Sequence, residues 1–286
     1  MKNFIERFAE FIKSLEFGDL PKYVVHEMNR VILDSIGVAI AGHSTEKGKT
    51  ASQFARRLKG PPESSIIGTS NKVSCVNAAF ANGELMNALD FDPVSSKGGH
   101  DIPTLVSAIF AVAESIGASG KDLILATALG IEISQRLRSA IKGISISEHK
   151  DAKVLWPNVL GYSTSVLGAT AGAGKCLNLS EEQVSNAIGI AGYICPPSTF
   201  MKFLDAAPIS TTKYGSLGWG AQTGVTAALL AEMGYTGDIN LFNGEYSFWR
   251  FIGKGKNEWN MEGITKDLGT NWLCHEIQYK QYPCGL

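Results

Sequence analysis

Hydrophobic residues recur at intervals of three and four residues along most of the chain, which is the spacing of one face of an α-helix. One run consists of Val25, Met28, Ile32, Ile36 and Ile40, and Gly42 ends it. Four other helices are predicted at 105–116, before Gly117; at 124–141, after Ser119-Gly120; at 180–194, where Ser180-Glu181-Glu182-Gln183 is a capping box; and at 223–233, before Gly234. The fold class is therefore predicted to be mainly α.

Strand-like patterns are scarce. Residues 64–67, SSII, form one short candidate, and no strand alternates with helices at the spacing of a βαβ unit. We therefore expect under a tenth of the residues in strands. Residues 158–174 and 186–192 are rich in Gly, Ala and Ser, which let helix backbones approach closely, so tightly packed interior helices are expected there. Residues 243–260 mix aromatic, glycine and charged positions and are interpreted as an irregular connection.

Composition narrows the function classes. The net charge of −1 over 286 residues gives no overall field for nucleic acid or an anionic membrane. The five cysteines are odd in number and have no C-x-x-C spacing, which favours reduced thiols over a disulfide framework or a zinc site. The N-terminus lacks the apolar core of a signal peptide, and no apolar run is long enough to span a bilayer. A cytoplasmic protein with neither nucleic-acid nor membrane partners is predicted.

Familiar catalytic motifs are absent from the sequence. Residues 172–176, GAGKC, resemble a phosphate-binding loop, but Ala169 and Cys176 occupy the positions that need Gly and Ser or Thr. A helix C-terminus is the better interpretation. There is no G-x-S-x-G nucleophile elbow, and the His and Cys spacings predict no metal site.

Residues 89–106, LDFDPVSSKGGHDIPTLV, hold one of the chain's five histidines just before a predicted helix. A loop that brings Asp90, Lys97 and His100 to a helix N-terminus would meet an anion with free backbone N–H groups, and histidine is the side chain that most readily moves protons near neutral pH. Gly98 and Gly99 would let this loop approach a substrate. The alternative is a plain turn, in which the aspartates only end one helix and begin the next.

Two further lysines have similar alternatives. Lys213 precedes a Gly- and Ala-rich helix, and Lys280 lies among aromatic residues in YKQYPCGL. Each is ordinarily interpreted as a solvent-exposed side chain, and each becomes interesting only beside the histidine loop.

Six segments in series resemble the methylcitrate dehydratase and cis-aconitate decarboxylase family, also called MmgE/PrpD, which includes iminodisuccinate epimerases. They are VILDSIGVAIAGH (31–43), AAFANGELMNALDFD (78–92), GGHDIPTLVSAIFAVAESIGASG (98–120), LATALGIEISQRL (125–137), TTKYGSLGWGAQTGVTAALLAEMGYTG (211–237) and YKQYPCG (279–285). The resemblance implies a large helical domain, a smaller α/β lid, a homodimer, no cofactor, and a small polycarboxylate substrate bound between the domains.

The resemblance also assigns roles to residues. Asp90, His100 and Lys213 match the family's catalytic positions, with His100 moving a proton and Asp90 orienting its ring. Lys280 matches a substrate-binding lysine, and Lys97 and Ser216 are further candidates for binding the substrate. The lysines would neutralise carboxylates and stabilise the negative charge that develops in an enolate-like transition state.

The chain departs from the family pattern in two ways. Histidine positions of the family are occupied by Asn87, Trp156, Ser216 and Gly285, and His149, seven residues before Trp156, is a candidate to compensate. The chain is also shorter than family members and stops where the lid should begin. We therefore expect a helical domain at 1–265, a truncated start of the lid at 266–286, and possible completion by a separate lid-bearing chain.

These observations leave several functions open. The first is a cofactor-independent lyase, with dehydration ranked above decarboxylation because Trp156 and Gly285 replace groups that a decarboxylase would use. An epimerase of the same family is another form of this enzyme hypothesis. The alternative from a different class is a helical oligomer or binding subunit that kept the fold and lost the chemistry.

Overall fold

The computed structural model describes residues 2–95, 99–140, 163–195, 207–213, 217–249, 260 and 263–284. These residues form nine α-helices and a short 3-10 turn: α1 (Phe4–Ser14), η1 (Phe17–Asp19), α2 (Lys22–Gly42), α3 (Glu46–Leu58), α4 (Cys75–Asn87), α5 (Ile102–Ser115), α6 (Gly120–Ser139), α7 (Ser163–Cys176), α8 (Glu181–Ile194) and α9 (Leu217–Glu232). The prediction of a mainly α fold is confirmed.

The four strands that the structure describes are two residues long each. β1 (Ser64–Ser65) pairs antiparallel with β2 (Lys72–Val73), and β3 (Val94–Ser95) pairs antiparallel with β4 (Ile277–Gln278). β1 falls within the one strand that the sequence predicted. The β3–β4 pair was not predicted, because its two partners are far apart in the sequence and each is too short to show an alternating pattern.

All five predicted helices are present as α2, α5, α6, α8 and α9. Capping boxes begin α6 at Ser119 and α8 at Ser180, and Gly117 and Gly234 take positive φ values of 66° and 90° just after α5 and α9. α9 begins six residues before the predicted run. α3 was missed because it buries only the small side chains Gly48, Ala51, Ser52 and Ala55, which leave no large apolar stripe to detect.

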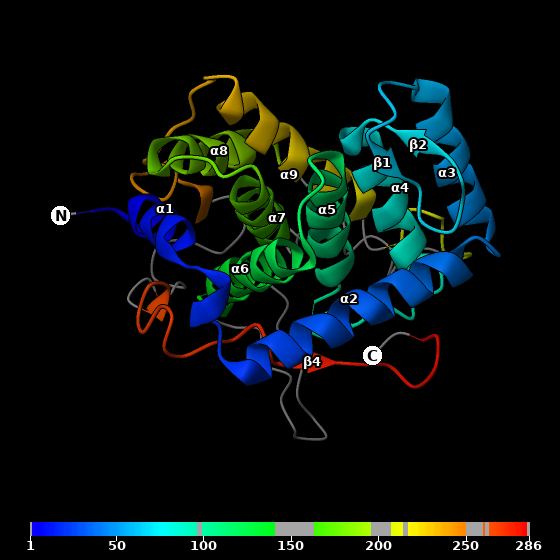
Figure 1. Cartoon of the computed structure of the whole chain (residues 1–286), viewed down its shortest axis with the longest axis horizontal. Helices are drawn as coiled ribbons and strands as arrows, with labels where there is room; N and C mark the ends of the chain where they lie inside the picture. Colours follow the sequence, from blue (N-terminus) through cyan, green and yellow to red (C-terminus); the bar gives the residue numbers. More distant parts are fainter. Residues whose placement is uncertain are drawn as a thin grey trace.

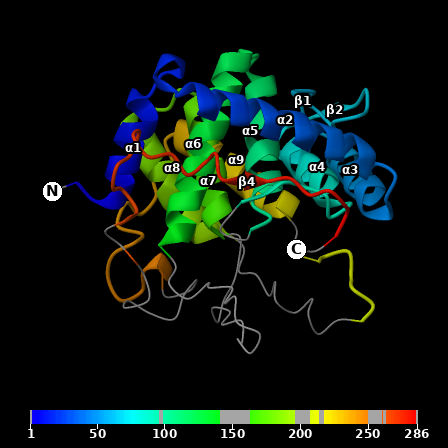
Figure 2. The same ribbon diagram turned by 90° about the horizontal axis from the view of Figure 1, so that it is seen from below.

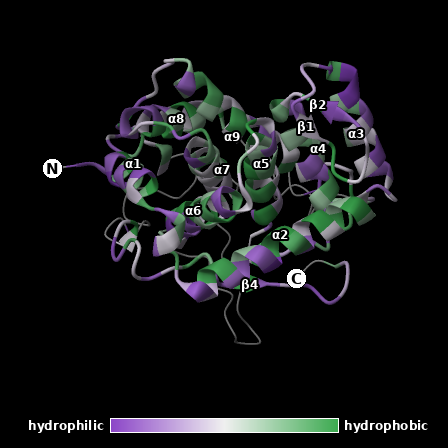
Figure 3. Cartoon of the chain, viewed as in Figure 1, coloured by the Kyte–Doolittle hydropathy of each residue, from purple (hydrophilic) through white to green (hydrophobic). Residues whose placement is uncertain are grey.

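Figures 1 and 2 show how the helices are arranged. α5 and α7 lie in the middle, with α4, α6 and α9 packed against them, and α1, α2 and α3 lie on the outside. Hydropathy differs between a helix packed against the middle ones and a helix on the outside: in Figure 3, α9 is largely hydrophobic and α3 is largely hydrophilic. The GAGKC segment lies in the last turns of α7, where Lys175 Nζ donates to the Leu15 carbonyl at 2.6 Å, so the helix C-terminus interpretation is confirmed.

Small residues allow the central helices to approach closely, as predicted for residues 158–174, of which the structure describes 163–174. A methyl group at Gly168 on α7 would collide with the carbonyl oxygen of Gly130 on α6 and lie 2.8 Å from Leu105 on α5. By contrast, a methyl group at Gly37 on α2 would meet nothing within 4 Å.

These two glycines make a matched pair for a stability test. Gly168→Ala should destabilise the fold by about 1–3 kcal/mol, because backbone atoms must move to make room. Gly37→Ala should stabilise it by about 0.4–1 kcal/mol, because alanine has less freedom to lose on folding. Urea unfolding measures both, and equal effects of the two substitutions would contradict the close packing of α6 and α7.

The C-terminal segment, residues 263–284, is fixed to the rest of the structure at several places. Glu132 on α6 accepts the backbone N–H groups of Leu273 and Cys274 at 2.7 and 2.9 Å, and the Arg136 guanidinium donates to the carbonyls of Lys266 and Asn271 at 2.6 Å each. Glu132 and Arg136 are themselves paired at 2.6 Å and are buried. The division at residue 265 into helical domain and lid stays a prediction.

Two further attachments lie along α2 and at β3. The Tyr279 hydroxyl donates to Glu27 Oε1 at 2.8 Å, and the Arg30 guanidinium lies 4.3 Å from the centre of the Tyr279 ring. Figures 1 and 2 both show the segment running alongside α2. With the β3–β4 pairing, this path carries the chain back to the loop that follows α4.

Candidate active site

The loop between α4 and α5 brings the candidate residues together. α4 ends at Asn87, and Asp90 then takes the left-handed conformation with φ of 54°, its N–H donating to the Asn87 carbonyl at 3.0 Å. Such a φ is uncommon for any residue but glycine, although aspartate and asparagine tolerate it best. The turn redirects the chain into β3, whose pairing with β4 places Lys280 beside Asp90.

Asp90 binds two of the predicted lysines. Lys213 Nζ donates to Asp90 Oδ2 at 2.6 Å, and Lys280 Nζ donates to Asp90 Oδ1 at 2.8 Å. Burial acts to raise the pKa of Asp90, but the hydrogen bonds from Lys213 and Lys280 outweigh it and lower the pKa to about 2. Asp90 is therefore a carboxylate at neutral pH, and its charge is compensated.

The two lysines differ in how far their side chains are exposed to a ligand. The Lys280 side chain is 1% exposed, and its ammonium donates to the Asp90 carboxylate, the Asp90 carbonyl and the Cys284 carbonyl, each at 2.8 Å. An ammonium has three donors, so these bonds account for all of them. The Lys213 side chain is 27% exposed. Lys280 is thus arranged to hold the Asp90 turn, and Lys213 is the more accessible cation.

His100 pairs with a carboxylate that the sequence analysis did not select. Its Nδ1 lies 2.8 Å from Asp92 Oδ2, whereas its Nε2 lies 3.8 Å from Asp90 Oδ1. Asp92 is fully buried and also accepts a hydrogen bond from Asn87 Nδ2 at 3.0 Å. Asp92 rather than Asp90 is therefore in position to orient the imidazole, and Asp90 lies on the opposite side of the ring.

Behind this pair lies a second row of polar groups. Lys47 on α3 donates to Asn87 Oδ1 at 3.0 Å and pairs with Glu84 Oε2 at 3.2 Å. Glu84 Oε1 in turn accepts the N–H of Gly218 in the first turn of α9 at 2.8 Å. These contacts connect the loop after α4 to α3 and α9, and all of the side chains involved are largely buried.

The glycine before His100 has a different neighbour from the one expected. A methyl group at Gly99 would lie 3.0 Å from the buried guanidinium of Arg138 on α6, so this glycine makes room for Arg138. Burial raises the pKa of the neighbouring Asp101, and the charge of Arg138 acts in the opposite direction. Asp101 Oδ2 accepts a hydrogen bond from Ser134 at 3.3 Å. Arg138 thus lies against the loop on its protein side.

A further carboxyl group, that of Asp34, lies near enough to Asp92 to feel its charge. Burial, and then the nearby charge of Asp92, raise the pKa of Asp34 on α2, while Arg30 lowers it. Among the described residues, Asp34 Oδ2 and Asp101 Oδ1 are buried without a hydrogen-bond partner. Protonation of either carboxyl group would remove the cost of burying its negative charge.

The remaining candidates cannot be placed. Lys97 and Ser216 lie outside the described residues, as do Trp156, His149 and Gly285. The structure therefore brings together Asp90, His100, Lys213 and Lys280 of the predicted set, and adds Asp92, Asn87 and Lys47. The one available signal for Asp92 was its position two residues after Asp90 in the same loop.

The site has three possible metal ligands, in Asp90, Asp92 and His100, with one ligand atom from each within 4.8 Å of the others. Two ammonium groups already bind the two oxygens of Asp90. A carboxylate neutralised in this way attracts a cation weakly, and the ammonium groups repel one. This donor set therefore fits an organic anion better than a metal ion, and the absence of a metal or cofactor stays a prediction.

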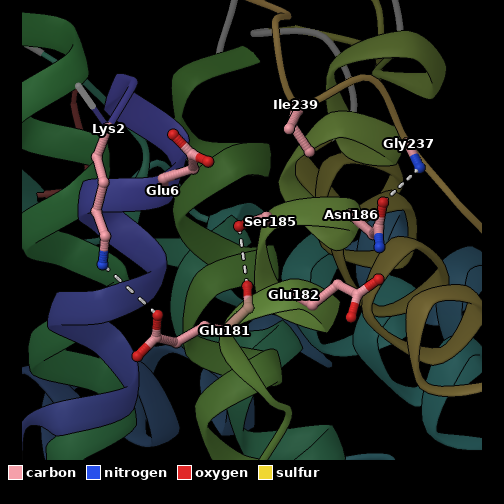
Figure 4. A pocket seen from close by; sticks show the side chains of 8 residues that line it. All are labelled: Lys2, Glu6, Glu181, Glu182, Ser185, Asn186, Gly237 and Ile239. Atoms are coloured by element: carbon pink, nitrogen blue, oxygen red, sulfur yellow. Dashed lines mark hydrogen bonds and ion pairs between the residues drawn. The ribbon is translucent and has the colours of Figure 1, made fainter.

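A cleft of about 510 Å³ lies at the other end of the helical bundle, between the starts of α1 and α8 (Figure 4). Its lining residues are Lys2, Glu6, Glu181, Glu182, Ser185, Asn186, Gly237 and Ile239. Lys2 pairs with Glu181 at 3.9 Å and with Glu10 at 3.2 Å. The charges of this cleft are mainly acidic and solvent-exposed, and none of its lining residues belongs to the site around His100.

Two general expectations can be compared with the described residues. All five cysteines lie within them and are free thiols. No helix in the described ranges is long and apolar enough to cross a membrane.

An imidazole held by a carboxylate, beside an accessible ammonium group, is an arrangement suited to proton transfer on an anionic molecule. A model of the MmgE/PrpD N-terminal domain matches residues 6–260. Because the match covers most of the chain, this protein belongs to the MmgE/PrpD family, as its sequence resemblance predicted.

Curated relatives carry the name cis-aconitate decarboxylase. The human protein is 29% identical over 296 residues, the Aspergillus terreus protein 27% over 295, and the mouse protein 28% over 299. The alignments cover 96–100% of this chain but only 56–57% of the relatives. The chain thus spans a little over half the length of the relatives that it matches.

Proposed function

We propose that this chain carries the proton-transferring part of a lyase that acts on a small polycarboxylate. The observation that supports this most is the pairing of His100 with Asp92 at 2.8 Å, next to Asp90 and its two lysines. Family membership and the names of the relatives agree with a small organic acid as substrate.

The chemistry would use the residues as follows. A substrate carboxylate binds the accessible ammonium of Lys213, which then shares its donors between the substrate and Asp90. His100, on its Nε2 side, exchanges a proton with the carbon next to a carboxylate. Lys213 stabilises the negative charge that this carbon and its carboxylate acquire in the transition state.

Two reactions fit this arrangement. In decarboxylation, the bond between a carbon and its carboxylate breaks, and carbon dioxide leaves. The electron pair of the broken bond stays on that carbon, and His100 supplies a proton to it. In dehydration, His100 removes a proton from carbon, and the electron pair of that C–H bond forms a carbon–carbon double bond. The C–O bond of the neighbouring carbon breaks, and the hydroxyl group takes a proton from the solvent and leaves as water. The relatives' names favour decarboxylation, whereas the replacement of family histidines by Trp156 and Gly285 favours dehydration.

The two reactions are separated by their products. The protein, together with any chain that co-purifies with it, is given cis-aconitate, and carbon dioxide release is measured. In parallel it is given 2-methylcitrate and citrate, and the ultraviolet absorbance of a new carbon–carbon double bond is measured. Inactivity on all three acids, with no binding by calorimetry, would favour the non-catalytic binding subunit.

The other expectations from the sequence analysis stay predictions. They are a homodimer, an absence of cofactor, a cytoplasmic location, and a lid supplied by a separate chain. Leu33 and Ile40 on the outer face of α2 are exposed, which is compatible with an interface but does not identify its partner.

Lys213→Met should weaken the binding of tricarboxylates by roughly 10- to 100-fold, since a hydrogen bond to a charged group contributes about 1.5–3 kcal/mol. Isothermal titration calorimetry with cis-aconitate and citrate measures the change. Lys49→Met is the control, because Lys49 pairs only with Glu46 on the exposed face of α3 in the contacts described. Unchanged affinity in Lys213→Met would remove Lys213 from the binding site.

A further inference from the structure

A series of hydrogen-bonded side chains leads to His100, and in each hydrogen bond the donor and the acceptor can be identified. Lys47 Nζ lies 3.0 Å from Asn87 Oδ1, Asn87 Nδ2 lies 3.0 Å from Asp92 Oδ1, and Asp92 Oδ2 lies 2.8 Å from His100 Nδ1. An amide group can be turned by 180° without a visible change in shape, so its orientation has to be inferred from its partners.

Lys47 settles that orientation. An ammonium group only donates hydrogen bonds, so the atom of Asn87 that faces it must be the oxygen. The amide nitrogen then faces Asp92 and donates to it, so Asp92 Oδ1 is an acceptor. Lys47 itself is fixed by Glu84 Oε2 at 3.2 Å, and both side chains are largely buried.

The last link concerns the proton between Asp92 and His100. A carboxylic acid is a much stronger acid than an imidazolium ion, so a proton shared between the two groups resides on the ring nitrogen. Nδ1 therefore carries a hydrogen whether the ring is neutral or charged. The proton that is gained and lost is the one on Nε2, the nitrogen that faces Asp90 at 3.8 Å.

We propose that Lys47 and Asn87 are positioning residues that, through Asp92, hold His100 in the Nδ1–H tautomer and leave Nε2 as the proton-transferring atom. This inference rests on the proposed function only in giving the tautomer a catalytic use. The arrangement also gives Asn87 a role at a position where family members usually have histidine, since its amide joins a cation on one side to a carboxylate on the other.

The tautomer is measured directly by nitrogen NMR on protein with ¹⁵N-labelled histidine, at a pH well above that at which imidazole titrates. The resonances of His100 are assigned among the five histidines by their loss in His100→Gln. We expect the unaltered protein to show the Nδ1–H form. Lys47→Met should shift the population towards the Nε2–H form, because Asn87 then no longer holds Asp92 Oδ1 in place and the carboxylate can turn away from Nδ1.

Two further variants separate positioning from simple loss of structure. Lys47→Arg keeps a donor-only cation and should retain the Nδ1–H form. Lys47→Met combined with Glu84→Gln removes the buried pair together, and the neutral amide still accepts the Gly218 N–H, so this double variant should fold and still shift the tautomer. Lys49→Met, on the exposed side of the same helix, should leave the tautomer unchanged.

Kinetics give a second measurement where turnover is found. Outer hydrogen-bond partners of metal-bound histidines contribute roughly 10- to 100-fold to activity, and we expect kcat to fall by that order in Lys47→Met with a smaller change in KM. A lack of turnover in the unaltered protein would contradict the proposed function and leave the tautomer result intact. An unchanged tautomer in both Lys47→Met and the double variant would overturn the inference.

Discussion

Replacing His100 with glutamine should lower turnover of the substrate acid by ~10²- to 10⁴-fold, which is the usual contribution of a general acid or base. Glutamine fills a similar space and can donate a hydrogen bond to Asp92 in place of Nδ1–H, but it cannot exchange a proton at neutral pH. The fold should therefore remain while the chemistry is lost. Steady-state kinetics and thermal unfolding of the same preparation measure the two effects.

The control for this experiment is His26→Gln, since His26 is exposed on α2. It should leave kcat unchanged. Full activity in His100→Gln would show that another group moves the proton, and a large loss of thermal stability would show that the substitution tests folding instead.

Removal of either partner of the buried Glu132–Arg136 pair should destabilise the fold by about 3–5 kcal/mol, because the remaining charge is left buried without its partner. In Glu132→Gln, the Arg136 guanidinium loses a carboxylate 2.6 Å away, and the N–H groups of Leu273 and Cys274 lose a charged acceptor. Arg136→Met should have an effect of similar size. Urea unfolding gives the free energies.

A surface pair provides the comparison. Glu46→Gln removes the partner of Lys49 on the exposed side of α3, and exposed pairs contribute little, so its unfolding should hardly change. A loss below about 1 kcal/mol in both Glu132→Gln and Arg136→Met would be too small for a buried pair. Such a result would mean that water can replace the hydrogen bonds that this pair makes to the backbone of residues 266–274.

How much could be predicted from the sequence depended on the range of the interactions involved. α2, α5, α6 and α8 were predicted because their apolar residues and caps lie within one helix. α3 was missed because its buried stripe consists of small residues. The β3–β4 pair was missed because its partners lie more than 180 residues apart, and two-residue strands leave no periodic pattern.

The same limit applies to the candidate site. Resemblance selected Asp90, His100, Lys213 and Lys280, and the structure brings these four together. It assigned the ring of His100 to Asp90, whereas the structure pairs the ring with Asp92, because that choice depends on the left-handed turn at Asp90. Asn87 was interpreted as the loss of a histidine, and its role emerges only when Lys47, 40 residues earlier, is seen to bind its oxygen.

Asp90 joins parts of the chain that are synthesised at very different times. Lys213 follows it by 123 residues and Lys280 by 190 residues. Closing such long loops costs entropy, so local helices form before these contacts do. While the chain is being made, α4 and α5 can fold long before Lys280 leaves the ribosome, and until then the Asp90 turn lacks the cation that holds it. The helical bundle can therefore exist for a time without the complete Asp90–lysine cluster, which forms only when Lys280 has reached the loop.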